Sequence, residues 1–160
     1  MEAFALEKAA APHPLRIAVP KGSLNEDAIA ALDAAGLNVD GLADAGRTLM
    51  LRNGDVEYII VRPTDAPVFV ALGAADCGIC GEDSLVEART DVVELVDITG
   101  MAEQIVDITA TGTTLRENNL VVVEDVLAST ARFFANPCSY RTNPRVAALA
   151  QALRQANKEN

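Results

Sequence analysis

Short apolar runs alternate with amphipathic segments along most of this 160-residue chain. The run "LRIAVP" predicts a strand over 15–20, and the following "KGSLNEDAIAALDAAG" predicts a turn and an amphipathic helix closed by Gly36. Further strands are predicted in "VVELVDI" and "ARFFANP", and a C-terminal helix in "PRVAALAQALRQA". Because strands alternate with helices, we expect an α/β fold with a mainly parallel sheet flanked by helices.

The middle of the chain continues this alternation. Apolar runs on both sides of Asn53-Gly54 predict a β-hairpin over Arg47 to Pro63, since this dipeptide suits a tight turn. A helix in "APVFVALGA", a buried strand in "ADCGICG" and a brief helix in "EDSLVEA" are predicted next. Two more strands are predicted in "AEQIVDI" and "LVVVEDVLA".

Composition and charge narrow the class of protein. The net charge of −10 argues against a surface that follows nucleic-acid phosphates, which requires clustered Lys and Arg. No apolar run approaches the roughly 18 residues of a membrane-spanning helix, and the N-terminal segment lacks the layout of a signal peptide. We therefore expect a cytoplasmic protein with no membrane partner, a flexible tail over 1–14 and a single domain over 15–160.

The stretch "IVDITATGTTL" at 105–115 is the strongest chemical motif in the chain. A strand that ends in Asp107 opens into a loop of Thr, Ala and Gly, whose backbone N–H groups can converge on a phosphate. The loop hydroxyls add donors, Gly112 allows close approach, and the carboxylate can accept hydrogen bonds from sugar hydroxyls. The motif suits a sugar phosphate, although a Thr-rich turn that only caps a helix fits these residues equally well. The loop lacks the Lys of a nucleoside triphosphatase and the three glycines of a dinucleotide-binding dehydrogenase.

Basic residues accompany this motif at predicted element ends. Lys21 and Gly22 follow the first strand, where open α/β sheets bind ligands, and Arg47 and Arg62 stand at the two ends of the hairpin. In an acidic protein these cations are candidates for an anionic ligand, and ion pairing with the many carboxylates is the alternative.

The three cysteines do not form a metal-binding pattern. Cys77 and Cys80 are spaced as C-x-x-C, but no second pair exists and His13, the only histidine, lies in the tail. We expect both cysteines to be small buried residues and Cys138 to pack in the same way.

Taken in order, "LRIAVPKGSL", "VEYIIVRPTDAPVFVALGAADCGICGEDSL", "VVELVD" and "AEQIVDITATGTTLRENNL" resemble the ATP phosphoribosyltransferase family, which opens histidine biosynthesis. The resemblance runs from Leu15 to about Arg154 and implies the two-lobed fold of periplasmic binding proteins. It implies a glycosyltransferase in which N1 of ATP displaces pyrophosphate from phosphoribosyl pyrophosphate, with Mg²⁺ bound to the substrate phosphates. Displacement at an anomeric carbon builds oxocarbenium character, so positioning and cations near the departing pyrophosphate carry the catalysis.

The resemblance also assigns roles to individual residues. Lys21 and Arg47 match basic positions around the pyrophosphate and triphosphate and are the expected catalytic residues. The loop is expected to hold the 5-phosphate and Asp107 the ribose hydroxyls. The expected substrate-binding residues are Gly22, Arg62, Asp107, Thr109, Ala110, Thr111, Gly112, Thr113, Thr114 and Leu115.

The chain departs from the family pattern in two ways. Ser23 stands where many members have an Arg, which removes one cation near the leaving group. In addition, "ELVD" is followed almost at once by "MAEQIVDI", whereas the family places most of a second lobe between these motifs. First-lobe segments 15–97 and about 116–160 therefore surround a phosphate-loop segment, 98–115, retained from the second lobe. We expect "QIVDI" to join the edge of the first lobe's sheet.

Two functional hypotheses follow from this shortened chain. The first is a catalytic ATP phosphoribosyltransferase subunit of the short form, a homo-oligomer that works with a regulatory subunit related to histidyl-tRNA synthetase. The second is a non-catalytic, one-lobed derivative with at most weak phosphate binding. A solute-binding protein of similar ancestry is a third hypothesis, which the missing signal peptide disfavours.

Overall fold

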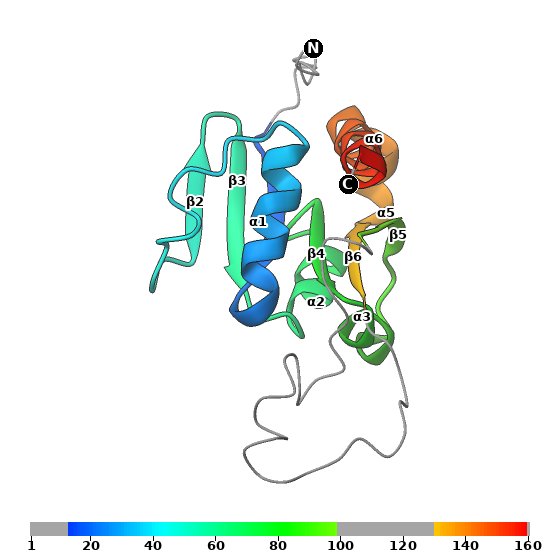
Figure 1. The fold of residues 1–160 in the computed structure, drawn as a ribbon. Helices are drawn as coiled ribbons and strands as arrows, with labels where there is room; N and C mark the ends of the chain where they lie inside the picture. The colour runs from blue at the N-terminus through cyan, green and yellow to red at the C-terminus, as the bar shows by residue number, and fades with distance from the viewer. Residues whose placement is uncertain (1–12, 99–129, 160) are drawn as a thin grey trace, which may run out of the picture.

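The structure is a computed structural model that describes residues 13–98 and 130–159. Its centre is a six-stranded sheet in the order β2-β3-β1-β4-β6-β5, shown in Figure 1. The strands are β1 (Leu15–Pro20), β2 (Met50–Asn53), β3 (Val56–Val61), β4 (Cys77–Gly81), β5 (Val93–Asp97) and β6 (Ala131–Ala135). The helices are the short 3-10 helix η1 (Gly22–Leu24), α1 (Asn25–Ala34), α2 (Ala66–Ala71), α3 (Glu82–Ala88), α5 (Pro137–Thr142) and α6 (Pro144–Glu159).

The expected α/β class is confirmed, with a sheet of mixed direction. The central strand β1 pairs in parallel with β3 and β4. The strand β2 is antiparallel to β3, and β6 is antiparallel to both β4 and β5. The strands β1, β3, β4 and β5 consequently share one direction, so their carboxyl ends meet at one edge of the sheet.

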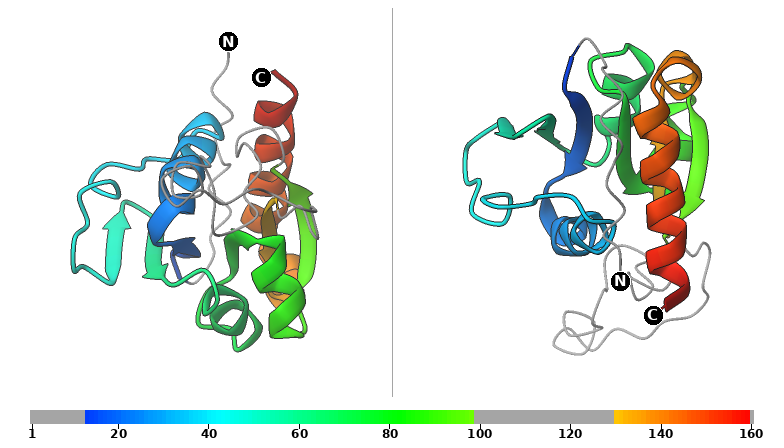
Figure 2. Two further views of the ribbon diagram at one scale, coloured as in Figure 1. Left: turned by 60° about the horizontal axis from the view of Figure 1, so that its bottom comes forward. Right: turned by 90° about the horizontal axis from the view of Figure 1, so that it is seen from above.

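Both faces of the sheet are covered by helices, because its central strands are apolar on both sides. Ile17 and Val19 of β1 face a core shared with α1 and α6, which includes Leu32 and Leu149. Ala18, between them in sequence, faces a second core shared with α2. Figure 2 shows α6 running beside β5 at the far edge of the sheet. Within the described part of the chain, no helix combines the length and apolar character needed to cross a bilayer.

The predicted hairpin forms, and its turn is displaced by one residue. Asn53 pairs with Val56 as the last residue of β2, so Gly54 and Asp55 are the two central residues of the turn. Gly54 has φ +63°, which places glycine at the first central position, as a type II′ turn requires. Both hairpin strands and their connection therefore follow from the local sequence.

One helix was missed by the sequence analysis. The strand predicted in "ARFFANP" ends at Ala135, and Asn136 then caps α5 by accepting hydrogen bonds from the backbone N–H groups of Cys138 and Ser139. Asn followed by Pro is a helix-start pattern that the sequence analysis did not use. The strands predicted in "AEQIVDI" and "LVVVEDVLA", and the docking of the former on the sheet, lie outside the described residues.

Candidate active site

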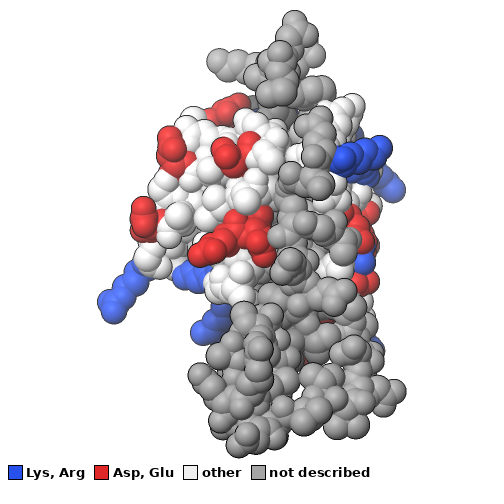
Figure 3. Space-filling view, in the orientation of Figure 1, with Lys and Arg blue, Asp and Glu red and all other residues white. Residues whose placement is uncertain are grey.

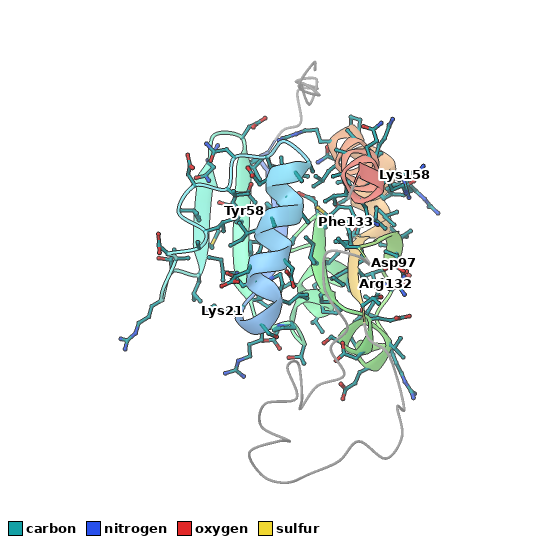
Figure 4. The ribbon with its side chains drawn as sticks, viewed as in Figure 1. Lys21, Tyr58, Asp97, Arg132, Phe133 and Lys158 are labelled. Carbon is teal, nitrogen blue, oxygen red and sulfur yellow. The ribbon has the colours of Figure 1, made fainter. Side chains whose placement is uncertain are left out.

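The ends of β1 and β3 bring two of the predicted basic residues together. Pro20 and Val61 are register partners, and the chain continues from them into Lys21 and Arg62. The backbone N–H of Lys21 donates to the carbonyl of Val61 at 2.8 Å, which extends the ladder by one more bond. Figure 4 shows Lys21 at the end of the sheet toward which β1 and β3 point. The two cationic residues thus leave adjacent strands at the same edge.

Arg47 reaches this edge from the opposite direction. Because β2 runs antiparallel to β3, the residues that precede β2 approach the carboxyl end of β3. The backbone N–H of Ile60 donates to the carbonyl of Leu49 at 2.9 Å, which continues the pairing two residues short of Arg47. We call the three cations Lys21, Arg47 and Arg62 the basic edge.

The basic edge is not neutralised by carboxylates of the described chain. Arg47 and Arg62 are exposed and Lys21 is partly exposed. Among the ion pairs of residues 13–98 and 130–159, none involves these three side chains. Figure 3 shows basic side chains projecting below a face rich in carboxylates. The alternative of ordinary ion pairing therefore finds no support in this part of the chain, and the three cations stay available to an anion.

Open space at Gly22 adjoins these cations. Gly22 has φ +84°, and among the described residues no heavy atom outside its own stretch of chain lies within 4 Å of the position where a side chain would begin. The following helix is fixed nearby, because the side-chain amide of Asn25 donates to the carbonyl of Pro20 at 2.9 Å. The backbone after β1 is thus open to a ligand and held in place by α1. Ser23, exposed beside it, adds no charge.

An acidic helix borders the basic edge. Glu26 and Asp27 lie in the first turn of α1, where negative charge is favourable. Partial burial, with a smaller contribution from the charge of Glu26, raises the pKa of Asp27. These two carboxylates therefore lie within a few residues of Lys21 along the chain.

Segment 99–129 is joined to the sheet through two neighbouring strands. The chain passes Ile98 after β5 and returns at Thr130 before β6. The backbone N–H of Ile98 donates to the carbonyl of Ala131 at 2.8 Å, and that of Glu82 donates to the carbonyl of Thr130 at 2.8 Å. We call this pair of attachment points, Ile98 and Thr130, the neck. It lies at the carboxyl end of β5, on the same edge of the sheet as the basic edge.

The remaining predicted site residues belong to the segment beyond the neck. Their placement relative to the basic edge therefore stays a prediction. The residues concerned, all outside the described residues, are Asp107, Thr109, Ala110, Thr111, Gly112, Thr113, Thr114 and Leu115.

A cluster of ion pairs that the sequence analysis missed fixes the neck. Arg132, at the start of β6, pairs with Glu82 at 2.9 Å, Glu94 at 3.0 Å and Asp97 at 3.0 Å. Burial alone would lower the pKa of Arg132, but the hydrogen bond with Glu82 and the three carboxylate charges raise it. Two sequence features could have indicated this cluster. Arg132 stands inside an apolar strand, and another predicted strand carries the two carboxylates of "ELVD". The cluster joins β5, β6 and α3 at the carboxyl edge.

The cysteines occupy separate environments. Cys77 lies in the core beneath α1 and α6, whereas Cys80 lies in the core beneath α2, so their sulfurs point to opposite faces. Burial raises the pKa of both thiols, that of Cys80 to about 12. The expected packing of these two residues is confirmed. The same expectation for Cys138 is wrong, because this residue is exposed in the first turn of α5.

Comparisons with known proteins identify the family. The sequence model described as "HisG: ATP phosphoribosyltransferase" matches residues 62–99 and 92–155. A protein of that name from Rubrobacter xylanophilus is 39% identical over 191 residues, with 79% of this chain and 88% of the relative covered. Another from Moorella thermoacetica is 34% identical, with 89% and 92% covered. The 191-residue alignment is longer than this 160-residue chain, so it includes a gap in the chain.

A solved structure supports the fold. The "ATP phosphoribosyl transferase (HisG:HisZ) complex from Thermotoga maritima" contains a chain that superimposes with a TM-score of 0.69 and 22% sequence identity. The superposition covers 91% of this chain and 100% of the other. This protein shares the periplasmic-binding-protein-like fold of that enzyme. On the matches to the family model and to relatives above 30% identity, the chain belongs to the ATP phosphoribosyltransferase family.

Proposed function

We propose that this chain is a catalytic subunit of ATP phosphoribosyltransferase, which transfers phosphoribosyl from phosphoribosyl pyrophosphate to N1 of ATP and releases pyrophosphate. The observation that carries the proposal is the basic edge: three cations without carboxylate partners in the described chain, on one edge of an otherwise acidic protein. Both substrates and the departing pyrophosphate are polyanions, so this edge suits their phosphates. The reaction would be the first step of histidine biosynthesis.

In this mechanism the chain's own residues bind and orient. Lys21, Arg47 and Arg62 would hold the pyrophosphate and triphosphate groups, so that negative charge gathering on the leaving group meets fixed positive charge. The loop from Thr109 to Leu115 would bind the 5-phosphate, and Asp107 the ribose hydroxyls. The common position of the basic edge and the neck at the carboxyl edge of the sheet supports this arrangement.

Mg²⁺ is proposed to arrive with the substrate phosphates. The described residues gather no group of three His, Cys, Asp or Glu side chains that would hold a metal ion. The nearest carboxylates at the neck, Glu82 and Asp97, already pair with Arg132. A cation shared with phosphate oxygens fits this arrangement, because Mg²⁺ commonly binds few protein ligands and keeps substrate oxygens and waters.

A second candidate, the non-catalytic one-lobed derivative, is supported by the way the family matches this chain. The family model matches in two segments that overlap at 92–99, next to the neck. At the neck, β5 and β6 are joined by backbone hydrogen bonds between their own residues. Their pairing therefore does not depend on the presence of a further lobe. In this case the basic edge would bind anions weakly and no product would form.

We propose further that the protein assembles with copies of itself and with a regulatory subunit. The solved neighbour is titled a HisG:HisZ complex, which supports a partner of that kind. The helix α2 exposes Val68 and Phe69, and Leu72, directly after the helix, is 81% exposed. Such an apolar face favours association. A cytoplasmic location is proposed with this biosynthetic role.

The experiment that tests these candidates begins with the intact mass of the purified protein. A mass near 16.8 kDa establishes that the purified chain carries no additional segment between Asp97 and Gly100. Formation of phosphoribosyl-ATP is then followed with ATP, phosphoribosyl pyrophosphate and Mg²⁺, with and without the regulatory subunit. Turnover that falls in Lys21→Ala and persists in Lys158→Ala supports the enzyme. Figure 4 shows Lys158 at the other end of the molecule, which makes it a matched lysine control.

Absence of product under both conditions would reject the catalytic proposal. Calorimetry with pyrophosphate then tests the derivative: binding that weakens in Lys21→Ala but not in Lys158→Ala supports it. No binding at all would reject a functional role for the basic edge.

A further inference from the structure

The turn of the β2–β3 hairpin contains the chain's one Asn-Gly dipeptide, Asn53-Gly54. An asparagine side chain can react with the backbone nitrogen of the next residue, and a following glycine offers no Cβ to hinder that approach. Asn53 ends β2 and Gly54 occupies the first central position of the turn. The dipeptide is therefore placed at an exposed tip, with its reactive groups on consecutive residues.

The structure holds the side-chain amide of Asn53 in a defined position. Its Nδ2 donates to the backbone carbonyl of Asn38 at 3.0 Å and to that of Asp40 at 3.0 Å. A third contact, at 3.3 Å, joins it to Oδ1 of the Asn38 side chain. All three partners are oxygen acceptors, so only the NH₂ group of the amide fits this position.

The acceptors are themselves fixed. Oδ1 of Asn38 accepts from the backbone N–H of Asp40 at 2.9 Å, which closes the segment on itself. The hydroxyl of Tyr58, a fully buried residue, donates to the carbonyl of Asn38 at 2.7 Å. The segment 38–40 is thus anchored to the core on one side and binds the Asn53 amide on the other. We call these bonds to Asn53 the amide latch.

We propose that Asn53 is a site of spontaneous deamidation and that the amide latch controls its rate. In the reaction the Gly54 nitrogen loses its proton and bonds to Cγ of Asn53. The Cγ–Nδ2 bond breaks and ammonia leaves, which gives a cyclic imide. Water then adds to either imide carbonyl and opens the ring to aspartate or isoaspartate. The latch retards the first step, because Nδ2 must leave its three acceptors before Cγ turns toward the Gly54 nitrogen.

The product is incompatible with the latch. A carboxylate at position 53 would place oxygen against the carbonyls of Asn38 and Asp40, and the donated hydrogen bonds would become repulsive contacts. Isoaspartate would also lengthen the backbone by one atom beside the pair formed by Asn53 and Val56. Deamidation therefore releases segment 38–40 from the hairpin, and the change is irreversible.

The rate is measured by peptide mass spectrometry on the full chain incubated at mildly alkaline pH. Samples are the native protein, the protein in denaturing urea, and the folded variants Asn38→Ala and Tyr58→Phe. We expect conversion at position 53 to be at least about ten-fold faster in urea than in the native protein, the factor that corresponds to ~1.4 kcal/mol of latch opening. The deamidation rates of the two variants should lie between those of the native protein and of the protein in urea. Asn136 and Asn143 are internal controls, because each precedes a proline without an N–H and should stay unchanged.

Three results would overturn the proposal. An intact Asn53 in urea would show that it is not a deamidation site. Equal rates in native protein and urea would show that the latch does not protect it. Native-like rates in both variants, with each variant folded by its melting curve, would assign the protection to other contacts.

The product's effect is tested separately with Asn53→Asp, and Asn53→Ala serves as the uncharged control. Both lose the donated hydrogen bonds, but only the aspartate adds repulsion. We expect Asn53→Asp to melt about 2–4 °C below Asn53→Ala, the shift that corresponds to ~1 kcal/mol in a domain of this size. Equal melting temperatures would contradict the stated incompatibility.

Discussion

Asp97 and Arg132 lie opposite each other on β5 and β6, and the Oδ2 of the carboxylate is 3.0 Å from Nη1 of the guanidinium. Arg132 also reaches Glu82 at the start of α3, so a single side chain joins three elements where the sheet ends. Its side chain is 15% exposed, whereas the carboxylates are more open to solvent. The cluster consequently fixes both strands that border segment 99–129.

Replacement of Arg132 by Met is expected to destabilise the fold by about 1–3 kcal/mol, because Glu82, Glu94 and Asp97 would face one another without a cation. Urea unfolding measures the loss, and Lys158→Met is the exposed control. The loss should shrink at high salt, which screens the partly exposed carboxylates. An Arg132→Met variant as stable as the wild type in low salt would refute a stabilising role.

A side chain at Gly78 of β4 is expected to crowd its neighbours. A Cβ at this position would lie 3.1 Å from Cβ of Ala18, 3.2 Å from Cζ of Phe134 and 3.2 Å from Cγ2 of Val70. We expect Gly78→Ala to lower the free energy of unfolding by about 1–3 kcal/mol through overpacking. In a Val70→Ala background the same substitution should cost less, because one of the crowded atoms is gone. Additive losses in the double variant would rule out this steric cause.

Stability is expected to fall above pH 9 through three buried acids, the thiols of Cys77 and Cys80 and the phenol of Tyr58. Burial is the main cause that raises the pKa of Cys80 from 9.0 to about 12, and burial raises that of Tyr58 from 10.0 to about 12. Burial is also the main cause that raises the pKa of Cys77. The folded state therefore keeps these protons where the unfolded chain releases them. The stabilisation is complete below pH 9 for Cys80 and below pH 10 for Tyr58, and it is lost as pH rises toward 12.

Unfolding by urea at a series of pH values tests this expectation. Cys80→Ala should reduce the decline between pH 9 and 10, where the two buried thiols contribute, and the thiol of Cys77 should account for the decline that remains. The exposed Cys138 is the control, and Cys138→Ala should leave the profile unchanged. An unaltered slope in Cys80→Ala would disprove the assignment to this thiol.

The two arginines of the basic edge should contribute separately to anion binding. We expect Arg47→Gln and Arg62→Gln each to weaken pyrophosphate binding by about ten-fold, which corresponds to ~1.5 kcal/mol for one charge-assisted hydrogen bond. Calorimetry at two salt concentrations measures the effect, which should be larger at low salt. Arg141→Gln, at the last turn of α5, is a matched exposed control. Unchanged affinity in both edge variants would remove them from the site.

Most of the described architecture could be predicted because it depends on local patterns. The apolar run 15–20, the glycines at 36 and 54 and the apolar face of the C-terminal helix each fix an element through its own residues. The order of the strands and the antiparallel direction of β6 could not be predicted in this way. They depend on which strands meet across the core, as when Phe133 of β6 lies opposite Ile79 of β4.

The same limit applies to the candidate site. Lys21 and Arg62 could be named as candidates because each follows a recognisable strand, and the pairing of β1 with β3 places them on adjacent strands. Arg132 was missed because its three partners come from β5 and α3. The amide latch of Asn53 was missed because its acceptors lie 13 to 15 residues away along the chain.

The neck has a consequence for how this protein can change over evolutionary time. Its two attachment points, Ile98 and Thr130, lie on neighbouring strands and make backbone hydrogen bonds within the described part of the chain. The length and sequence of the segment between them can therefore vary without breaking these bonds. An insertion or deletion within segment 99–129 is therefore expected to leave the described fold intact, because β5 and β6 are paired by hydrogen bonds of their own.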